Sequence, residues 1–292
     1  MMDECGRVGE IAFWGGDDRQ LMAAETLRQK GYTITMKGIA HAGDQAQPTK
    51  AARYVVLPVS GMDQEGWLSL SGGERMRLDR NWLSELRSDC LLLCGRSVEA
   101  FDRWCQEMGL KEHHYLQDQT FQAANAIPTA EGVLRLTYAS RTETIAGSKV
   151  LITGFGYCGK ALAQRLKALG AEVAVAARSV DDRAYGRMLG LAMLDLTELA
   201  QAAAQAELVY NTVPAQVLTR DVLEKLPKDA VLIDLASAPG GTDFAAAREL
   251  GLSAVLAGNI PGRYFPQTAG KLLAEHLEHI ILKAQTSSAV TE

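Results

Sequence analysis

A glycine-rich turn in the middle of the chain constrains the fold more than any other feature. It has the sequence Gly-Phe-Gly-Tyr-Cys-Gly over residues 154–159, so its glycines follow the G-x-G-x-x-G spacing. An apolar run at 149–153, typical of a buried strand, precedes the turn, and helical spacing of apolar residues follows it at 160–169. A second apolar run lies at 172–177. This order predicts a βαβ unit, in which the two strands are parallel.

In this context each glycine of the turn has a physical task. Gly154 permits a tight turn, Gly156 lets the backbone approach a pyrophosphate, and Gly159 lets helix and strand pack closely. The helix N-terminus then offers free N–H groups and a positive dipole to the phosphates. We expect six residues of the turn to bind a dinucleotide: Gly154, Phe155, Gly156, Tyr157, Cys158 and Gly159. The alternative is a glycine turn that binds no ligand.

The end of the second strand favours NADP over NAD. NAD-binding proteins place Asp or Glu about 20 residues after the glycines, where the carboxylate binds the ribose 2′-hydroxyl. This chain has Arg178 and Ser179 there. Arg178 can pair with a 2′-phosphate, and Ser179 can donate a hydrogen bond to it. The alternative is that Arg178 is a solvated surface side chain.

Two further predicted strands, at 208–212 and 231–235, end at the same edge of this sheet. Ligands of open α/β sheets lie outside the carboxyl ends of the strands, so the residues that follow should lie near the nicotinamide and its ribose. The expected neighbours are Thr212, Val213, Pro214 and Ser237. Asp234 can line the same crevice or be a buried residue that shapes its loop through backbone hydrogen bonds.

The first 127 residues predict a separate α/β domain. Apolar runs at 10–14, 32–36, 53–57 and 91–94 alternate with helical patterns, which favours a parallel sheet covered on both faces. The polar, glycine-rich segment 62–80 is predicted to be a loop.

The fold class is therefore α/β with two doubly wound parallel sheets. We expect a flavodoxin-like domain over 1–127, to which a C-terminal helix at 268–285 returns. A Rossmann dinucleotide-binding domain with a linking helix should cover 128–267.

Composition narrows the partners and the compartment. The net charge of −5 argues against nucleic acid, which requires a basic face. No apolar run reaches the roughly 20 residues that cross a bilayer, and the first residues show no signal peptide. Five cysteines without a CxxC pair are typical of reduced thiols in a cytoplasm, and no metal site is expected. Whether the chain forms a homo-oligomer is left open.

Several segments predict an anion-binding site in the first domain. Asp17 or Asp18 can cap the helix that follows the first strand. Arg19 then lies in the first turn, where it opposes the helix dipole, and this conflict favours anion binding over a structural role. Ser60 follows another strand at the same edge, and Arg263 lies near the second domain crossing.

Six segments together resemble a known family. They are GGDDRQL at 15–21, LPVS at 57–60, IPTAEG at 127–132, LITGFGYCGKALA at 151–163, LIDLASAPGGTDF at 232–244 and PGRYFPQTAGKLLA at 261–274. This set is similar to the A subunits of dipicolinate synthase from spore-forming bacteria, over about residues 10–280.

The resemblance implies the last step of dipicolinate synthesis in the cytoplasm of the mother cell. Dihydrodipicolinate would lose a hydride to NADP, and a second, flavoprotein-like B subunit would be the partner. Such a substrate is a dianion, so Arg19, Arg263 and Ser60 are candidates to bind it, and Asp17 or Glu131 is a candidate for acid–base help.

Two other functions compete with this one. A two-domain 2-hydroxyacid or amino-acid dehydrogenase shares the layout, but 2-hydroxyacid enzymes use a histidine after the late strands, and residues 235–257 contain none. A non-catalytic NADP-binding protein that assists a catalytic partner is the second alternative, because no acid–base dyad is evident in the sequence.

Overall fold

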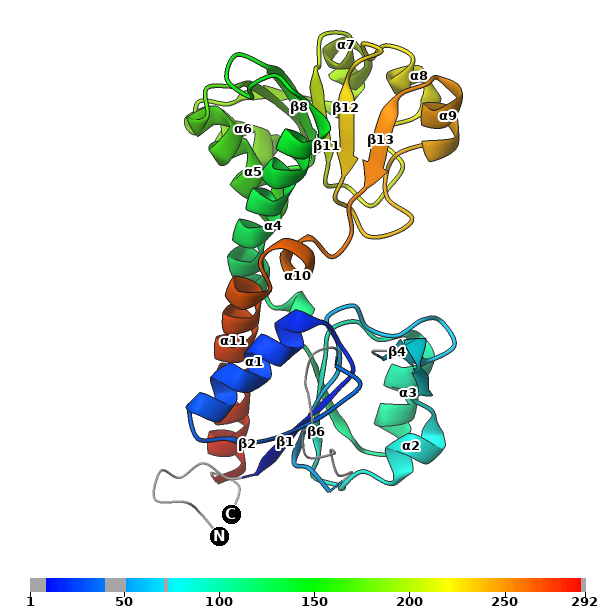
Figure 1. The fold of residues 1–292 in the computed structure, drawn as a ribbon, viewed down its shortest axis with the longest axis vertical. Helices are drawn as coiled ribbons and strands as arrows, with labels where there is room; N and C mark the ends of the chain where they lie inside the picture. The colour runs from blue at the N-terminus through cyan, green and yellow to red at the C-terminus, as the bar shows by residue number, and fades with distance from the viewer. Residues whose placement is uncertain (1–8, 40–50, 71–72, 290–292) are drawn as a thin grey trace. The chain divides into compact units, whose positions relative to one another are not determined.

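The structure, a computed structural model, describes residues 9–39, 51–70 and 73–289 and contains two compact units (Figure 1). We call residues 1–125 together with 261–292 the first unit, and residues 126–260 the second unit. Among the described residues, no helix is long and apolar enough to span a membrane.

The first unit is built on a five-stranded parallel sheet with the order β2-β1-β3-β6-β7. The strands are β1 (Glu10–Trp14), β2 (Thr33–Lys37), β3 (Tyr54–Val56), β6 (Leu91–Cys94) and β7 (Lys111–His114). Counted along the chain this is the order 2-1-3-4-5, which flavodoxin-like folds also have. The edge strand β7 was not predicted, because its sequence KEHH has no apolar residue.

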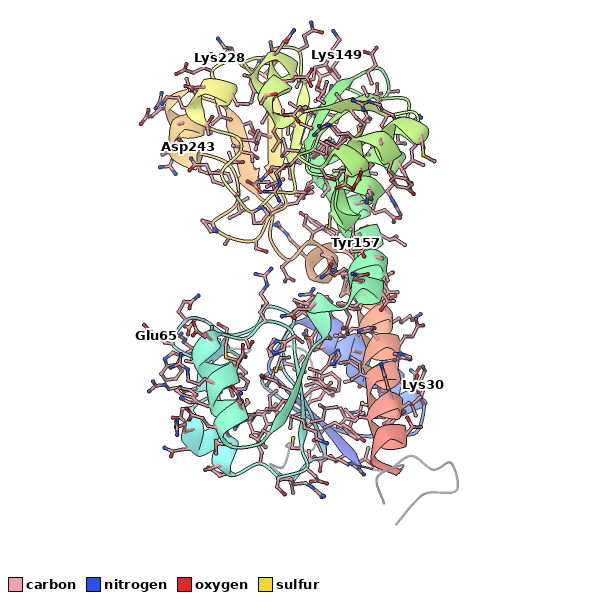
Figure 2. All side chains as sticks on the ribbon, turned by 180° about the vertical axis from the view of Figure 1, so that it is seen from behind. Lys30, Glu65, Lys149, Tyr157, Lys228 and Asp243 are labelled. Carbon is pink, nitrogen blue, oxygen red and sulfur yellow. The ribbon has the colours of Figure 1, made fainter. Side chains whose placement is uncertain are left out.

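Helices cover both faces of this sheet. One face carries α1 (Asp18–Gln29) and α11 (Pro266–Ala289), which lie side by side, and the other carries α2 (Arg80–Ser84) and α3 (Glu99–Glu107) (Figure 1). From α11, the side chains of Leu273, Leu277 and Ile281 are fully buried in the core under α1. Lys30, labelled in Figure 2, forms an ion pair with Glu278 of α11. The prediction that the C-terminal helix returns to the first sheet is therefore confirmed.

The prediction of a loop over 62–80 was wrong. An antiparallel ribbon forms there from β4 (Trp67–Ser69) and β5 (Arg75–Arg77). The carboxylate of Asp63 accepts hydrogen bonds from the backbone N–H groups of Glu65 and Trp67, at 3.0 and 2.9 Å, and so fixes the start of the ribbon. Strands of three residues are too short for an alternating pattern to be visible in the sequence.

The second unit contains a six-stranded parallel sheet with the order β10-β9-β8-β11-β12-β13. The strands are β8 (Lys149–Thr153), β9 (Glu172–Ala176), β10 (Ala192–Leu194), β11 (Leu208–Asn211), β12 (Val231–Asp234) and β13 (Ser253–Leu256). Within the unit this is the Rossmann order 3-2-1-4-5-6, which confirms the predicted fold class. The short edge strand β10 was not predicted.

The flanking helices of the second unit are α5 (Tyr157–Ala168), α6 (Val180–Met188), α7 (Leu199–Ala203), α8 (Arg220–Leu223) and α9 (Phe244–Glu249). Two further helices cross the unit boundaries, α4 (Gln119–Ser140) and α10 (Ile260–Tyr264). The sequence predicts that the linking helix begins after Pro128, but α4 begins nine residues before that proline and contains it. A proline usually ends a helix, so this continuation could not be predicted. The hydroxyls of Thr137 on α4 and Tyr210 on β11 lie 2.8 Å apart and tie this helix to the second sheet.

Replacing a buried leucine of α11 should destabilise the protein, whereas replacing an exposed one should not. Leu273 is fully buried and Leu282 is 46% exposed on the same helix. We expect Leu273→Ala to lower the free energy of unfolding by about 2–5 kcal/mol and Leu282→Ala to change it by less than about 0.5 kcal/mol. Urea unfolding followed by circular dichroism measures both. Equal effects would show that α11 does not belong to the core of the first unit.

Candidate functional site

The protein's own packing requires two glycines of the turn between β8 and α5. Gly154 has a φ of +93°, and a Cβ there would lie 2.3 Å from the Thr212 Oγ1 atom. A Cβ on Gly159 would lie 2.3 Å from the carbonyl oxygen of Gly154. A side chain at Gly159 would therefore push α5 away from the end of β8, and one at Gly154 would clash with the loop after β11. These contacts also place Thr212 and Val213 directly against the turn.

Gly156, by contrast, is not required by any neighbour among the described residues. Its φ of −72° suits every residue type, and no described heavy atom lies within 4 Å of the position that a Cβ would take. It is the N-cap of α5 and makes no side-chain hydrogen bond to that helix. Tyr157, labelled in Figure 2, opens the helix. The turn thus presents open space in front of a helix N-terminus, which suits a pyrophosphate.

The loop after β9 holds Arg178 at the surface. The guanidinium of Arg183 donates to the carbonyl oxygens of Ala177 and Arg178, at 2.7 and 2.8 Å, and pairs with Asp195 at 2.8 Å. The backbone at Arg178 is fixed in this way, while its side chain is exposed and forms no ion pair with any described residue. Ser179 caps α6 by accepting a bond from the Asp182 N–H at 3.2 Å, and its own hydroxyl hydrogen stays available.

A second cation near the glycine turn was missed in the sequence. The ammonium of Lys160, on the first turn of α5, lies 5.2 Å from the ring centroid of Phe155 and 3.3 Å from Asp182. A lysine at this place opposes the helix dipole, which is the same local conflict as at Arg19. It could have been found by that criterion.

A buried network shapes the loops after β11 and β12. The amide of Asn211 donates to the carboxylate of Asp234 at 2.9 Å, and Thr153 donates to Asn211 in turn. The same carboxylate accepts from the N–H groups of Ala236 and Gly241, each at 2.9 Å. Asp234 is fully buried. It therefore shapes its loop and does not line the crevice.

These loops carry the other residues that we predict to contact the cofactor. Thr212 donates its hydroxyl to the Thr153 carbonyl at 2.9 Å, Val213 is half-buried, and Pro214 and Ser237 are exposed. A Cβ on Gly241 would lie 2.2 Å from the Val213 carbonyl, so the two loops touch.

The thiol of Cys158 in the glycine turn is half-buried. Burial raises the pKa of this thiol above the usual range, and a hydrogen bond with Thr129 of α4 opposes this only in part. A raised pKa favours the protonated thiol, which is a weaker nucleophile than the thiolate.

In the first unit the structure brings Asp17 and Arg19 together. Asp17 caps α1, and its carboxylate accepts from the Arg19 guanidinium at 3.0 and 2.8 Å, in a two-point pair. Arg19 is only 4% exposed. The sequence predicts that this charge binds an anion, and the structure shows that Asp17 holds it in a fixed orientation. A Cβ on Gly262 would lie 2.6 Å from both side chains, so the backbone of α10 packs on the pair.

Other candidates of the first unit lie at the same edge of its sheet. Ser60 is exposed in the turn after β3, and Arg263 is exposed on α10 with its guanidinium 5.1 Å from the Tyr264 ring centroid. Arg96, which follows β6, was missed. A Cβ on Gly61 would lie 2.5 Å from the Arg96 Cβ, so this exposed arginine adjoins the turn that carries Ser60. Its place directly after a buried strand could have indicated it.

Glu131 belongs to the second unit. It lies on α4, and its carboxylate pairs with Arg165 of α5 at 3.2 Å. Its side chain is 49% exposed.

A cavity of about 710 Å³ lies at the amino ends of strands of the second sheet, opposite to the glycine turn. Its lining includes Lys149, Glu172 and Ala192, each the first residue of a strand. Ligands of such sheets bind at the carboxyl ends, so we do not assign the nucleotide to this cavity.

Each of the two parts of the chain matches a known family model. Residues 10–116 match the family model of the N-terminal domain of the dipicolinate synthase A subunit. Residues 96–240 match the NAD-binding domain of D-isomer specific 2-hydroxyacid dehydrogenases. D-lactate dehydrogenase from Escherichia coli, at 11% identity and a TM-score of 0.64, shares the fold alone.

Relatives of much higher similarity cover more than nine-tenths of the chain. It is 31% identical to the dipicolinate synthase A subunit of Bacillus subtilis over 287 residues, which are 94% of this chain and 97% of that protein. The crystal structure of the B. subtilis protein matches with a TM-score of 0.86 at 30% identity, over 95% of this chain and 97% of that one. That of the Bacillus halodurans protein matches with a TM-score of 0.85 at 28% identity, over 93% and 97%. The chain therefore belongs to the family of dipicolinate synthase A subunits, and it is an oxidoreductase with a domain that binds a nicotinamide dinucleotide.

Proposed function

We propose that this protein oxidises dihydrodipicolinate to dipicolinate with NADP in the mother cell of a sporulating bacterium, together with a flavoprotein-like B subunit. Two observations support NADP binding. Gly156 leaves open space in front of the N-terminus of α5, and Arg178 is exposed after the next strand. The name of the B. subtilis relative supports the substrate.

In this proposal the second unit binds and orients the nucleotide. The N–H groups at the start of α5 bind the pyrophosphate, and Arg178 with Ser179 binds the 2′-phosphate. Thr212, Val213, Pro214 and Ser237 contact the nicotinamide and its ribose. The nicotinamide supplies the hydride acceptor. The substrate loses one hydride to it and one proton to a base, and the ring becomes aromatic.

The first unit binds the substrate dianion in this proposal. Arg19, held in a fixed orientation by Asp17, binds one carboxylate together with Ser60, and Arg263 binds the other. Asp17 already accepts three hydrogen bonds from Arg19, counting its backbone N–H at 3.0 Å, which favours a positioning role for this carboxylate. Glu131, which is half exposed, is then our candidate for the proton acceptor.

A 2-hydroxyacid dehydrogenase activity is less well supported. Such enzymes need a histidine near the nicotinamide, and the loops after β12 and β13 contain none, because residues 235–257 lack histidine.

Adding one methyl group at Gly156 should weaken nucleotide binding without unfolding the protein. The added Cβ would project into open space, so we expect Gly156→Ala to shift the unfolding temperature by less than about 2 °C. It should weaken NADP binding at least tenfold, because the pyrophosphate needs that space. Isothermal titration measures the affinity. Unchanged affinity would show that the pyrophosphate does not approach this residue.

Removing the guanidinium of Arg178 should weaken the binding of NADP much more than that of NAD. A charge-assisted hydrogen bond contributes about 1.5–3 kcal/mol, so we expect Arg178→Ala to weaken NADP binding about 10- to 100-fold. NAD binding should change less than about threefold, since NAD has no 2′-phosphate.

The matched control is Arg248→Ala, which removes an exposed arginine of α9 and changes the net charge equally. It should leave both affinities unchanged. Equal losses for NADP and NAD in Arg178→Ala would contradict the assigned selectivity.

The reaction itself can be followed by absorbance. With freshly generated dihydrodipicolinate and NADP, the chain together with the B subunit should form NADPH and dipicolinate in a one-to-one ratio, and Gly156→Ala should be slower. NADPH formation without the B subunit would show that the partner is dispensable. If dipicolinate formed no faster than in the enzyme-free control, with or without the partner, the substrate assignment would be wrong.

A further inference from the structure

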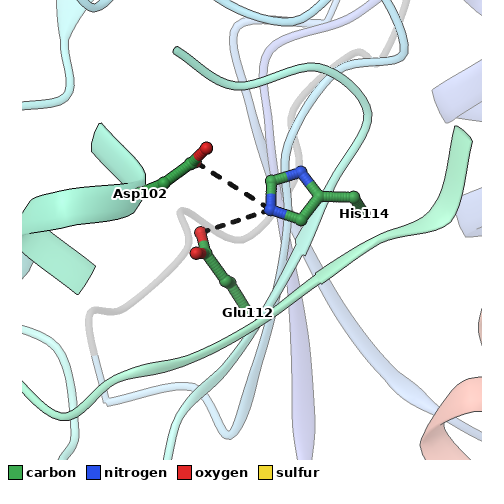
Figure 3. Close-up of side chains that lie close together, drawn as sticks. All are labelled: Asp102, Glu112 and His114. Carbon is green, nitrogen blue, oxygen red and sulfur yellow. Dashed lines mark ion pairs between the residues drawn. The ribbon is translucent and has the colours of Figure 1, made fainter. Parts of the chain in front are cut away.

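Three ionisable side chains of the first unit converge between α3 and the edge strand β7. Glu112 and His114 are two residues apart on β7 and thus point to the same face of the sheet, toward Asp102 of α3 (Figure 3). The His114 Nε2 atom lies 3.5 Å from Glu112 Oε2 and 3.9 Å from Asp102 Oδ1. All three atoms lie within 4.8 Å of one another.

The two carboxylate oxygens of this cluster pair with His114 at ion-pair distance but accept no hydrogen bond. Asp102 Oδ1 and Glu112 Oε2 are both inaccessible to solvent, and neither has a hydrogen-bond partner among the described residues. Their separations from the imidazole exceed the 2.7–2.9 Å of a charge-assisted hydrogen bond. Buried carboxylate oxygens need a compensating group, and His114 offers one only at ion-pair distance, so the cluster has room for a further cation.

These separations fit ligands around a shared metal ion better than they fit hydrogen bonds between the imidazole and the carboxylates. In a tetrahedral zinc site with bonds of about 2.0–2.2 Å, ligand atoms lie about 3.3–3.6 Å apart. The 3.5 Å separation falls in this range, and the 3.9 Å separation needs only a small movement of Asp102. Imidazole with two carboxylates is a ligand set that such ions accept.

The imidazole of His114 is already oriented for such a role. Its Nδ1 atom lies 3.2 Å from the Ser97 hydroxyl oxygen, which leaves Nε2 to face the two carboxylates. Ligating histidines are commonly held by their other ring nitrogen in this way. A cavity of about 480 Å³, lined in part by Asp102 and Glu112, adjoins the cluster.

We propose that Asp102, Glu112 and His114 bind one divalent first-row transition ion of the Zn²⁺ class. The ion joins α3 to the polar edge strand β7, and a water molecule occupies its fourth position. The site lies wholly in the first unit and does not depend on the nucleotide chemistry proposed for the second.

A neighbouring cluster provides the control. His113 points to the other face of β7, where its Nε2 atom lies 2.7 Å from Asp118 Oδ2, and the His276 Nε2 atom lies 2.6 Å from the same oxygen. Burial disfavours ionisation of Asp118, but these two hydrogen bonds more than offset it and lower its pKa. This carboxylate is already satisfied, so we assign no metal to it.

The test titrates the full chain, stripped with a chelator, with Zn²⁺ in competition with a chromophoric chelator. We expect one ion per chain and a higher unfolding temperature with Zn²⁺. Glu112→Gln and His114→Ala should each weaken binding more than about 100-fold, because loss of an outer-shell partner alone costs about 10- to 100-fold. His113→Ala should bind as the parent does. Co²⁺ bound to the parent should show the visible absorption of a four-coordinate site.

Several results would overturn the proposal. They are no Zn²⁺ binding by the parent chain, unchanged binding by the near-isosteric Glu112→Gln, or loss of binding in His113→Ala instead. If His114→Ala does not fold, Glu112→Gln and the Co²⁺ spectrum still decide the question.

Discussion

The close approach of α5 to the end of β8 is the contact on which the rest of the second unit depends. It exists because Gly159 lies against the carbonyl of Gly154, with no room for a side chain at either residue. This contact aims the first turn of α5 at the carboxyl edge of the sheet. It also fixes the entry to the helix, so that Gly156 faces open space and not a neighbouring side chain. Gly156 thus has no packing role among the described residues, which fits the approach of a pyrophosphate that we propose.

Around that contact the loops are held by buried polar groups. Asp234 has no cation beside it in the network that we describe, and its charge is distributed over N–H and hydroxyl donors, including Thr242 at 2.7 Å. Such a carboxylate organises two loops at once, because it joins Asn211 to the 236–242 segment. Arg183 does the same for the loop that carries Arg178. Six of the twelve residues that we expect to touch the nucleotide are exposed, and residues behind them, such as Asp234, are buried and paired.

Apolar periodicity and glycine positions in the sequence predicted much of the fold. The two parallel sheets, the βαβ unit with its fingerprint and the return of α11 followed from these patterns. Strand β7 and the ribbon of β4 and β5 did not, because they lack the apolar run of a buried strand, and the apolar β10 was missed because it is only three residues long. The length of α4 was misjudged because Pro128 normally ends a helix.

The candidate sites could likewise be predicted only in part. Positions after strand ends could be predicted, but pairings between side chains could not. The conflict at Arg19 was visible in the sequence, while its neutralisation by Asp17 two residues earlier depends on a rotamer. Likewise, Glu112 and His114 show an i, i+2 spacing, but nothing in the sequence brings Asp102 to them.

Hydride transfer from the substrate to a nicotinamide held at the glycine turn is the central step of the proposed function. Its most direct test uses dihydrodipicolinate deuterated at its saturated ring carbons, NADP and the complete enzyme, with the deuterium located by NMR. We predict one deuterium at C4 of the nicotinamide of each NADPH formed. Deuterium released only into water while dipicolinate accumulates would contradict this mechanism.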